Sequence, residues 1–342
     1  MTMPLNRRAL LAAAAAVAGS AALPRPSAAA TPLRVGYIPI IPMTQLYVLN
    51  GEGWAKDAGL DLTLTSFQSG PAMIQALASG TLDVAYVGIG PAMIARSKGV
   101  KLKVVAANVI DQVALIGRGP FASLTASAAS PAEGFAAFRA AQGRPAKIAS
   151  LPAGSVPDTV LRYWAQEVAK IPASDLQIVG MGDEQVQQAL LSGAVDGASI
   201  LEPTLTLVQS RLPDARLVAK AGTLFPQQPG AILAVTESAI AQSRAAVATL
   251  VRLHIRATAF AIANPDRTAV IVTEAIGKGL IEPAVMRAAL VSGATNFVDD
   301  PRRIVDSTKK MQAFQQSLGQ IPDPVDVDAL FDHSFYDAAK AG

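Results

Sequence analysis

The sequence predicts an α/β protein with two lobes. Its 342 residues exceed what one small core organises and suit two lobes of about 100–150 residues each. Short apolar strands alternate with helical patterns from residue 33 to about residue 235, a pattern typical of parallel sheets flanked by helices. A helix–turn–strand segment also occurs in each half of this region. We therefore expect each lobe to contain its own sheet.

The recurring segment comprises residues 75–85 and residues 188–198. Their sequences, QALASGTLDVA and QALLSGAVDGA, are identical at seven of eleven positions. In each copy a helix ends at a glycine suited to the left-handed position after a helix, and an apolar strand follows the aspartate. A chance similarity between two segments rich in Ala, Leu and Gly is the alternative.

Two apolar strands lie where the chain is expected to pass between the lobes, Val113–Gly117 and Ala231–Val235. We interpret both strands as hinges, because a two-lobed chain that returns to its first lobe must cross twice. The predicted division assigns residues 31–112 and 231–342 to one lobe and residues 113–230 to the other.

The first thirty residues have the plan of a cleaved export signal. Arg7 and Arg8 precede an apolar stretch that ends at Leu23, and the small residues Ala28–Ala30 follow, so we expect cleavage near Ala30. The paired arginines resemble a twin-arginine signal, with the general export route and a membrane anchor as alternatives. No later apolar run is expected to span a membrane. We therefore expect a soluble, periplasmic mature protein.

Composition excludes several classes of function. Without the three arginines of the first thirty residues, basic and acidic residues balance at 26 each, which leaves no electrostatic footprint for nucleic acid. Cysteine is absent, so disulfides, thiolate metal sites and a lipid-anchored start are excluded. No nucleotide-binding loop, serine-hydrolase motif or metal-ligand spacing is present, and we assign His254 and His333 structural roles. We expect no metal, no cofactor and no enzymatic activity.

Prolines mark the turns that are expected to carry function. Five turns between a strand and a helix have a proline near the helix start, namely Pro42, Pro71, Pro91, Pro157 and Pro203. Proline suits the first helical turn, where its missing N–H would be unpaired. Such turns lie beyond the carboxyl ends of strands, where α/β sheets bind ligands. Helix N-termini present free N–H groups and partial positive charge, so turns around one cleft can hold an anionic or polar group without arginine.

Few side chains around these turns are charged, and Glu202 beside Pro203 is the exception. We expect Glu202 to face the cleft and to select a solute that carries an N–H donor, with helix capping as the alternative. Turn formation is likewise the alternative for each glycine and serine. The predicted ligand-binding residues are Ile41, Met43, Gln45, Ser69, Gly70, Gly88, Ile89, Asn108, Gly154, Ser155, Val156, Glu202 and Gln228.

Most of residues 33–275 resemble the periplasmic solute-binding proteins of the nitrate, sulfonate and taurine class, which feed ABC transporters. The most specific segments are Val35–Pro39, Ser69–Pro71, Asp83–Pro91, and Gly193–Asp196 leading to Glu202-Pro203. The resemblance implies a type II periplasmic-binding-protein fold with the ligand between the lobes. It also implies a small solute as ligand and an ABC transporter permease as partner, and we expect a monomer.

Two departures narrow what the resemblance implies. Taurine-type relatives place an acid in the strand that corresponds to Ala231–Leu233, which is apolar here, and this argues against taurine. Thiamine-pyrimidine-precursor enzymes share the fold but use a cysteine-rich motif and histidines that this chain does not supply. Such an enzyme and a sensory module that docks on a receptor are the alternative functions. Nitrate, a sulfonate, a carboxylate and a small heterocycle all stay open as the solute.

Overall fold

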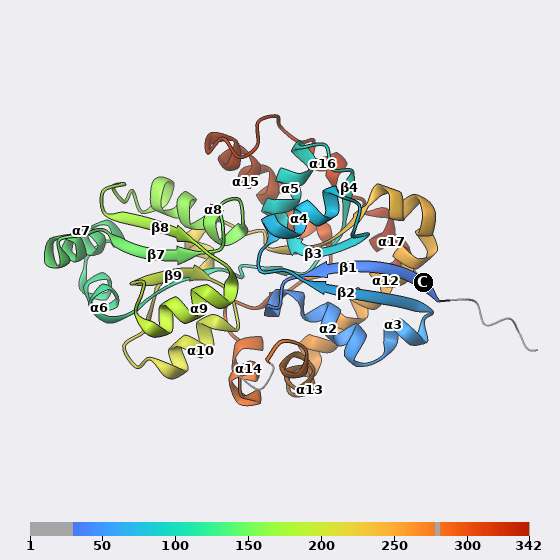
Figure 1. The fold of residues 1–342 in the computed structure, drawn as a ribbon, viewed down its shortest axis with the longest axis horizontal. Helices are drawn as coiled ribbons and strands as arrows, with labels where there is room; N and C mark the ends of the chain where they lie inside the picture. The colour runs from blue at the N-terminus through green and yellow to red at the C-terminus, as the bar shows by residue number, and fades with distance from the viewer. Residues whose placement is uncertain (1–29, 278–280, 342) are drawn as a thin grey trace, which may run out of the picture. The chain divides into compact units, whose positions relative to one another are not determined.

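The computed structural model describes residues 30–277 and 281–341, and the predicted export signal lies outside them. Two five-stranded sheets occupy the described chain (Figure 1). The strands of the first sheet are β1 (Thr31–Tyr37), β2 (Leu60–Ser66), β3 (Val84–Gly88), β4 (Leu102–Ala107) and β11 (Ala231–Thr236). The strands of the second are β6 (Ala114–Gly117), β7 (Ala146–Ser150), β8 (Leu176–Gly180), β9 (Gly197–Ile200) and β10 (Arg216–Ala219). The predicted α/β class with two sheets is confirmed.

Both sheets are mixed, whereas the sequence predicted parallel ones. The strand orders are β2-β1-β3-β11-β4 and β10-β6-β9-β7-β8. β1 is parallel to β2 and β3, but β11 is antiparallel to β3 and β4. In the second sheet β7 is parallel to β8 and β9, but β6 is antiparallel to β9 and β10. The reason is that β6 and β11 enter from the other sheet, without the helical crossover that parallel neighbours require.

The chain passes between the sheets just before the strands predicted as hinges. β6 and β11 lie within the two sheets, so the connections are residues 108–113 and 220–230. The first contains β5 (Val109–Ile110), which pairs with β12 (Asn296–Phe297). The two connections lie side by side, because a bridge joins Ile110 to Pro229.

Helices cover the sheets, and five of them begin at or beside the proline turns that the sequence singled out. Before β11 they are η1 (Ile41–Met43), α2 (Thr44–Gly51), α3 (Trp54–Asp57), α4 (Gly70–Ala78), α5 (Ile89–Ser97), α6 (Gly119–Ser127), α7 (Pro131–Gln142), α8 (Val156–Tyr163), η2 (Trp164–Val168), α9 (Asp183–Ser192), α10 (Thr204–Arg211) and α11 (Ala221–Leu224). After β11 they are α12 (Glu237–Ala263), α13 (Pro265–Val272), η3 (Thr273–Gly277), α14 (Pro283–Leu290), η4 (Pro301–Ile304), α15 (Val305–Ser317), α16 (Val327–Leu330) and α17 (Ser334–Ala341).

The recurring sequence segment folds alike in both sheets. Gly80 after α4 and Gly193 after α9 have φ of +73° and +81°, a conformation that glycine adopts without steric cost. The strands β3 and β9 follow, as predicted. Each aspartate of the repeat then pairs with an arginine of its own sheet, Asp83 with Arg34 at 2.6 Å and Asp196 with Arg144 at 2.6 Å. The similarity is therefore structural as well as sequential.

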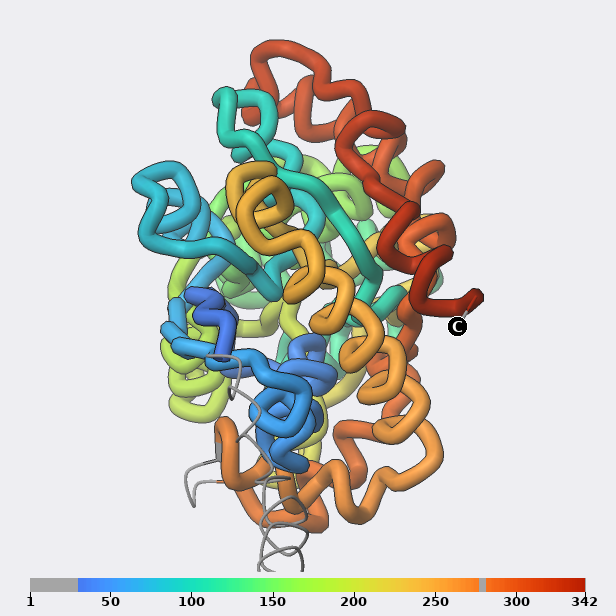
Figure 2. Tube along the Cα trace, turned by 90° about the vertical axis from the view of Figure 1, so that its right-hand side faces the viewer, coloured from blue at the N-terminus to red at the C-terminus, as the bar shows by residue number. Residues whose placement is uncertain are grey.

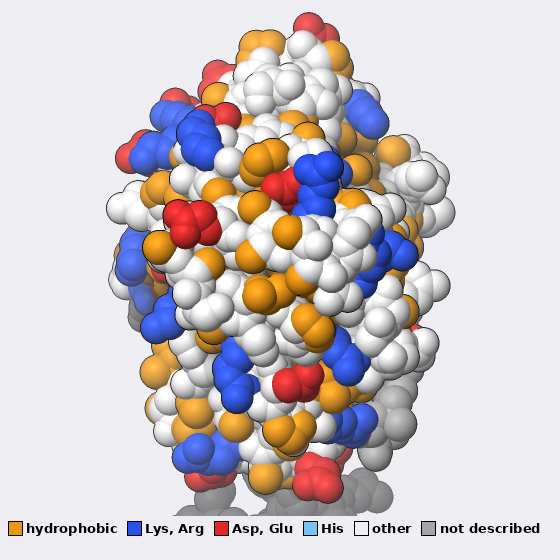
Figure 3. All heavy atoms as spheres, turned by 90° about the vertical axis from the view of Figure 1, so that its left-hand side faces the viewer, with side chains coloured by type: hydrophobic (Ala, Val, Ile, Leu, Met, Phe, Trp, Pro, Cys, Tyr) orange, Lys and Arg blue, Asp and Glu red, His pale blue; other side chains and the backbone are white. Residues whose placement is uncertain are grey.

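The far end of the second sheet carries charges of both signs. Figure 3 shows lysine and arginine side chains interspersed with acidic ones on this face. Some are paired, as in the contact of Arg139 on α7 with Asp175, 2.8 Å apart. No single sign of charge dominates this face, which agrees with the balanced composition.

α12 is the one helix of the described chain that is long and apolar enough to span a membrane, and half of its apolar window is buried inside the protein. The sequence led us to expect no such segment. α12 packs against β4, β11, α2 and α17, as Figure 2 shows for its path beside the C-terminal helices. A buried core helix passes the same test of length and composition, so this is weak evidence for a membrane span.

His254 lies on the buried face of α12. Its Nε2 is 2.8 Å from the Ala107 carbonyl, and its Nδ1 is 3.4 Å from the Tyr86 hydroxyl. Because the carbonyl can only accept, Nε2 carries the proton and Nδ1 accepts from tyrosine. Burial lowers the pKa of His254 to about 4. The ring is therefore a neutral, hydrogen-bonded part of the core.

α15 packs against helices of both sheets, namely α5 and α8. Its residue Gln315 is fully buried. The Gln315 Nε2 donates to the Gly154 carbonyl at 3.4 Å and to Thr159 Oγ1 at 3.3 Å. The C-terminal segment thus touches both sides of the region described next.

Candidate functional site

Three helix N-termini meet at one small cavity between the two sheets. α4 and α5 follow strands of the first sheet, and α8 follows a strand of the second. The enclosed volume is about 20 Å³, which is room for roughly one water molecule. The lining residues are Ile38, Ile40, Met43, Gly70, Gly88, Pro91, Gln112, Leu151, Ser155, Val156, Pro157, Leu201 and Ala231. None of these lining side chains is ionisable, so the polarity of the cavity comes from the helix ends and from Gln112 and Ser155.

Close approach across the cavity requires glycine at two helix starts. A Cβ at Gly88 would lie 2.9 Å from Val156 Cγ2, which belongs to the other sheet's helix. A Cβ at Gly70 would lie 2.5 Å from the Pro91 ring. Contacts this short do not occur between real side chains. The missing side chains therefore let the helix ends come together.

Serine caps two of these helices. Ser69 Oγ accepts from Ala72 N at 3.4 Å, and Ser155 Oγ accepts from Asp158 N at 3.3 Å. α5 begins differently, because Ile89 N donates to the Gly230 carbonyl at 3.0 Å. The first-turn N–H groups of a helix that remain unpaired concentrate partial positive charge. All three helices begin at the lining of the same small volume.

The structure brings five of the predicted residues together in the cavity lining: Met43, Gly70, Gly88, Ser155 and Val156. Gly154 lines the adjoining larger cavity instead. The remaining predicted residues, Ile41, Gln45, Ser69, Ile89, Asn108, Glu202 and Gln228, do not belong to the lining of the small cavity.

Three buried amides hold the backbone around the cavity. Gln45 Nε2 donates to the Asn108 carbonyl at 2.8 Å, and Asn108 Nδ2 donates to the Pro42 carbonyl at 3.2 Å. Gln228 accepts from Val113 N at 2.8 Å and donates back to the Val113 carbonyl at 3.2 Å. Gln45 and Asn108 therefore fix the turn before α2, and Gln228 joins the two connections between the sheets.

Glu202 does not belong to the lining of the small cavity. Its carboxylate accepts from Thr206 N at 2.9 Å and from Thr206 Oγ1 at 2.8 Å, which caps the first turn of α10. Glu202 lines a separate cavity of about 320 Å³ with Lys220 and Ser292. Burial raises the pKa of Glu202. The chain enters α10 directly after β9, and this places the N–H of Thr206 within reach of the acid.

Replacing Glu202 by Gln should therefore leave solute affinity unchanged and alter the free energy of unfolding by at most about 1 kcal/mol. The lost charge-assisted hydrogen bond is offset because a buried charge is also removed. Denaturant unfolding and titration calorimetry on the same preparation measure both quantities, with Thr206→Val as a matched change to the same contact. A tenfold loss of affinity in Glu202→Gln would contradict this assignment.

An acid lies between the two sheets at the edge away from the connections. Asp183 begins α9 after the edge strand β8, and its N–H donates to the carbonyl of Gln68, beyond the edge strand β2, at 3.4 Å. The residue is 6% exposed, and its Oδ1 has no hydrogen-bond partner. Burial, and then the charge of Glu184, raise the pKa of Asp183 to about 7. The contact between the two sheets at this edge therefore buries the carboxyl group of Asp183.

Sequence reasoning missed most of the apolar lining. Ile38, Ile40, Leu151, Leu201 and Ala231 read as ordinary core residues, since nothing in an apolar side chain distinguishes a cavity wall from a core. Pro91 and Pro157 were recognised as turn residues but left out of the predicted set. Gln112 gave a usable signal, being a polar residue between two apolar strands, and its Oε1 accepts from Ala231 N at 3.2 Å.

Within residues 30–277 and 281–341 no group of three or more His, Cys, Asp or Glu side chains is arranged to hold a metal ion. The chemistry of the small cavity therefore rests on backbone N–H groups, two polar side chains and apolar walls. Such a site can bind and orient a small molecule, and its lining offers no nucleophile–base pair.

Comparison with known proteins adds the family. A model described as the NMT1-like family matches residues 27–276. A protein of Brucella abortus (strain 2308) named "Putative binding protein" is 30% identical over 241 residues, which are 69% of this chain and 69% of that protein.

Two solved structures share the fold. The periplasmic nitrate-binding protein NrtA from Synechocystis PCC 6803 has a TM-score of 0.76 at 15% identity, covering 91% of this chain and 88% of that one. The alkanesulfonate-binding protein SsuA from Xanthomonas axonopodis pv. citri, bound to MOPS, has a TM-score of 0.70 at 16% identity, covering 89% and 98%. Because the family match spans well over half of its length, this chain belongs to the NMT1-like family and has the two-lobed fold of periplasmic binding proteins.

Proposed function

We propose that this protein is the extracytoplasmic solute-binding component of an ABC importer and that it captures a small organic anion between its lobes. The observation that carries the proposal is the convergence of α4, α5 and α8 on one cavity without an ionisable side chain. Each helix N-terminus favours negative charge by about 0.3–1 kcal/mol. The names of NrtA and SsuA, which bind nitrate and alkanesulfonates, support the same class of ligand.

Solute burial by lobe closure is part of this proposal. We assign residues 31–112 and 231–342 to one lobe and residues 113–230 to the other, with the paired connections 108–113 and 220–230 as the hinge. A volume of about 20 Å³ is too small for an organic solute, so the lobes must separate to admit one and close around it. A hinge made of two adjacent connections permits this motion without unfolding either sheet.

The position of Glu202 bears on the class of solute. With its carboxylate capping α10, the cavity presents no negative side chain that would repel an anion. The earlier reason to require an N–H donor on the solute is thereby removed. We therefore propose sulfonates, carboxylates and nitrate as solutes in preference to amines and heterocycles.

A thermal-shift screen of the mature protein tests the function directly. Methanesulfonate, acetate and nitrate should include at least one stabilising ligand, whereas methylamine should have no effect at equal concentration. A ligand present at a hundred times its dissociation constant stabilises the folded state by about 2.7 kcal/mol. Stabilisation by amines alone would contradict the proposal, because the helix ends disfavour positive charge.

Export completes the proposed function. We expect cleavage after Ala30, so the mature protein should begin at Thr31, the first residue of β1. Removal of the signal then leaves β1, an interior strand of the first sheet, complete. Intact-mass analysis of the protein recovered from the periplasm measures the cleavage site. Recovery of the full chain in a membrane fraction would contradict a cleaved signal.

A further inference from the structure

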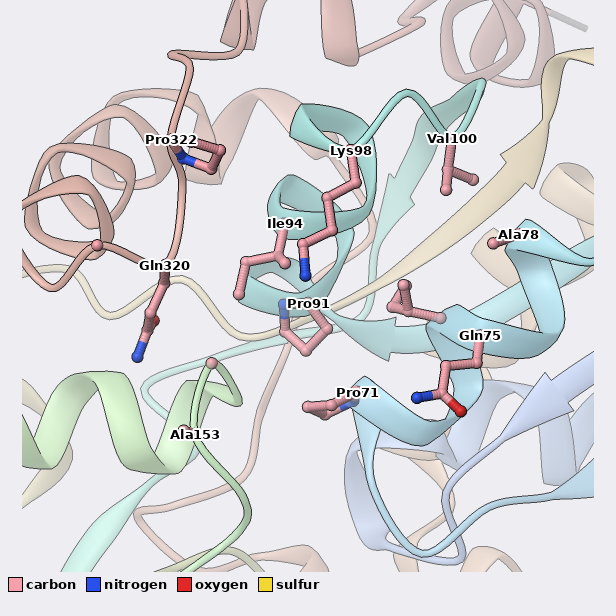
Figure 4. A pocket seen from close by; sticks show the side chains of 13 residues that line it. Pro71, Gln75, Ala78, Pro91, Ile94, Lys98, Val100, Ala153, Gln320 and Pro322 are labelled. Carbon is pink, nitrogen blue, oxygen red and sulfur yellow. The ribbon is translucent and has the colours of Figure 1, made fainter.

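A larger cavity of about 590 Å³ adjoins the small one. Its walls come from α4 and α5, from the turn before α8 and from residues 319–322 after α15 (Figure 4). Pro91 lines both cavities. Two pairs of adjacent residues also contribute one residue to each cavity. Pro71 and Gly154 line the larger cavity, and their neighbours Gly70 and Ser155 line the small one. A single layer of residues therefore separates the two spaces.

The larger cavity has apolar walls and a few polar groups. The apolar side chains include Pro71, Ile74, Ile94, Val100 and Pro322. At the boundary between the two cavities the chain packs closely, because a Cβ at Gly154 would lie 2.6 Å from Ile94 Cδ1. An aliphatic chain can cover such walls and gain from leaving water.

Three side chains in the larger cavity can donate hydrogen bonds. Figure 4 shows the Lys98 ammonium over Pro91, with the amides of Gln75 and Gln320 on its two sides. The ammonium group of Lys98, an exposed residue, has no hydrogen-bond or ion-pair partner among the described residues. A cation without a counterion, flanked by amides, suits an acidic group.

We propose that the solute is an aliphatic chain with an acidic group at each end, held across both cavities. This rests on the proposed function. One acidic group sits at the N-termini of α4, α5 and α8, the chain passes Pro91, and the second acidic group pairs with Lys98. The small cavity offers too little volume for the chain, and the large one offers apolar walls next to it. Because both lobes line each cavity, the bound solute holds the lobes closed.

Calorimetry with matched probes tests the proposal. One series is methanesulfonate, hexanesulfonate and 6-sulfohexanoate, and the other is acetate, heptanoate and pimelate. In one of the two series, each methylene that enters the apolar cavity should raise affinity about two- to fourfold. The terminal carboxylate should add up to about fivefold, because Lys98 is exposed and an exposed ion pair contributes modestly.

Variants separate this proposal from the function on which it rests. Lys98→Met should remove the gain from the terminal carboxylate and leave the short probes unaffected, whereas Lys56→Met, on the exposed face of α3, should change neither. Ala153→Trp should occupy part of the larger cavity and reduce the gain with chain length. Equal affinity of short and long probes, or an undiminished gain in Lys98→Met, would overturn the two-ended solute while leaving anion capture intact. Binding of no anion in either series would overturn both.

Discussion

Replacing Gly88 by Val should reduce solute affinity by about tenfold to more than a hundredfold while leaving each lobe folded. The backbone at Gly88, with φ of −69° and ψ of 147°, is open to any residue, so the change acts through the new side chain. Even its Cβ would lie 2.9 Å from Val156 Cγ2 across the cavity. Overpacking of this kind costs about 1–3 kcal/mol, and separation of the lobes relieves it.

A second substitution tests whether the loss of affinity in Gly88→Val arises from a clash in the closed state. In the Gly88→Val background, Val156→Ala removes the methyl group that the new side chain meets, so affinity should recover. Gly222→Val is a control, because a Cβ at Gly222 meets nothing within 4 Å. Scattering should show a larger radius of gyration for Gly88→Val than for wild type with saturating solute. Wild-type affinity in Gly88→Val would show that the contact does not limit closure.

Asp183→Asn should stabilise the folded protein by up to about 4 kcal/mol at pH 8 and have little effect near pH 4. The folded pKa of about 7 exceeds the unfolded value of 3.8, and one pKa unit corresponds to 1.36 kcal/mol. The folded state therefore holds a proton that the unfolded state has lost between pH 4 and pH 7. The contribution of Asp183 is fully present below pH 4 and is lost as pH rises through about 7.

Unfolding free energies of wild type and Asp183→Asn, measured from pH 4 to pH 8, give this difference directly. His254 acts in the opposite direction, since its lowered pKa makes stability fall as the pH drops below 6.5. Its contribution is common to both proteins and cancels in the difference. Glu184→Gln removes an exposed charge one residue away. The difference in unfolding free energy between this variant and wild type should depend much less on pH. If the difference in unfolding free energy between wild type and Asp183→Asn did not change with pH, Asp183 would not be buried in its protonated form.

The repeated unit was predictable because its signals are local. A helix that ends at glycine and a strand that begins after aspartate are encoded within eleven residues, and Gly80 and Gly193 both adopt positive φ. The directions of β6 and β11 were not predictable in this way. The direction of each strand depends on the sheet from which the chain enters it, and no residue within β6 or β11 indicates which sheet that is.

The residues of the candidate site show the same difference between local signals, which the sequence reveals, and contacts that depend on distant residues. Gly70, Gly88, Ser155 and Val156 were found because helix starts have their own chemistry. The position of Glu202 outside the lining of the small cavity was not predictable, because the direction of a side chain after a strand depends on the hydrogen bonds nearby, here those from Thr206. Asp183 was missed because its burial results from contact with Gln68, which is more than a hundred residues away in sequence.

The contacts of Gln315 bear on how long a captured molecule stays bound. Its bonds to Gly154 and Thr159 are 3.4 and 3.3 Å long, and bonds of this length are weak. These two bonds alone would resist a separation of the lobes only weakly, so the edge-to-face contact of Phe314 on α15 with Tyr163 on α8, 5.2 Å between ring centroids, is the stronger link at this point. On the proposed function, the lifetime of the solute-bound state depends mainly on the contacts of the solute, so solutes that bind more tightly should differ mainly in their dissociation rate.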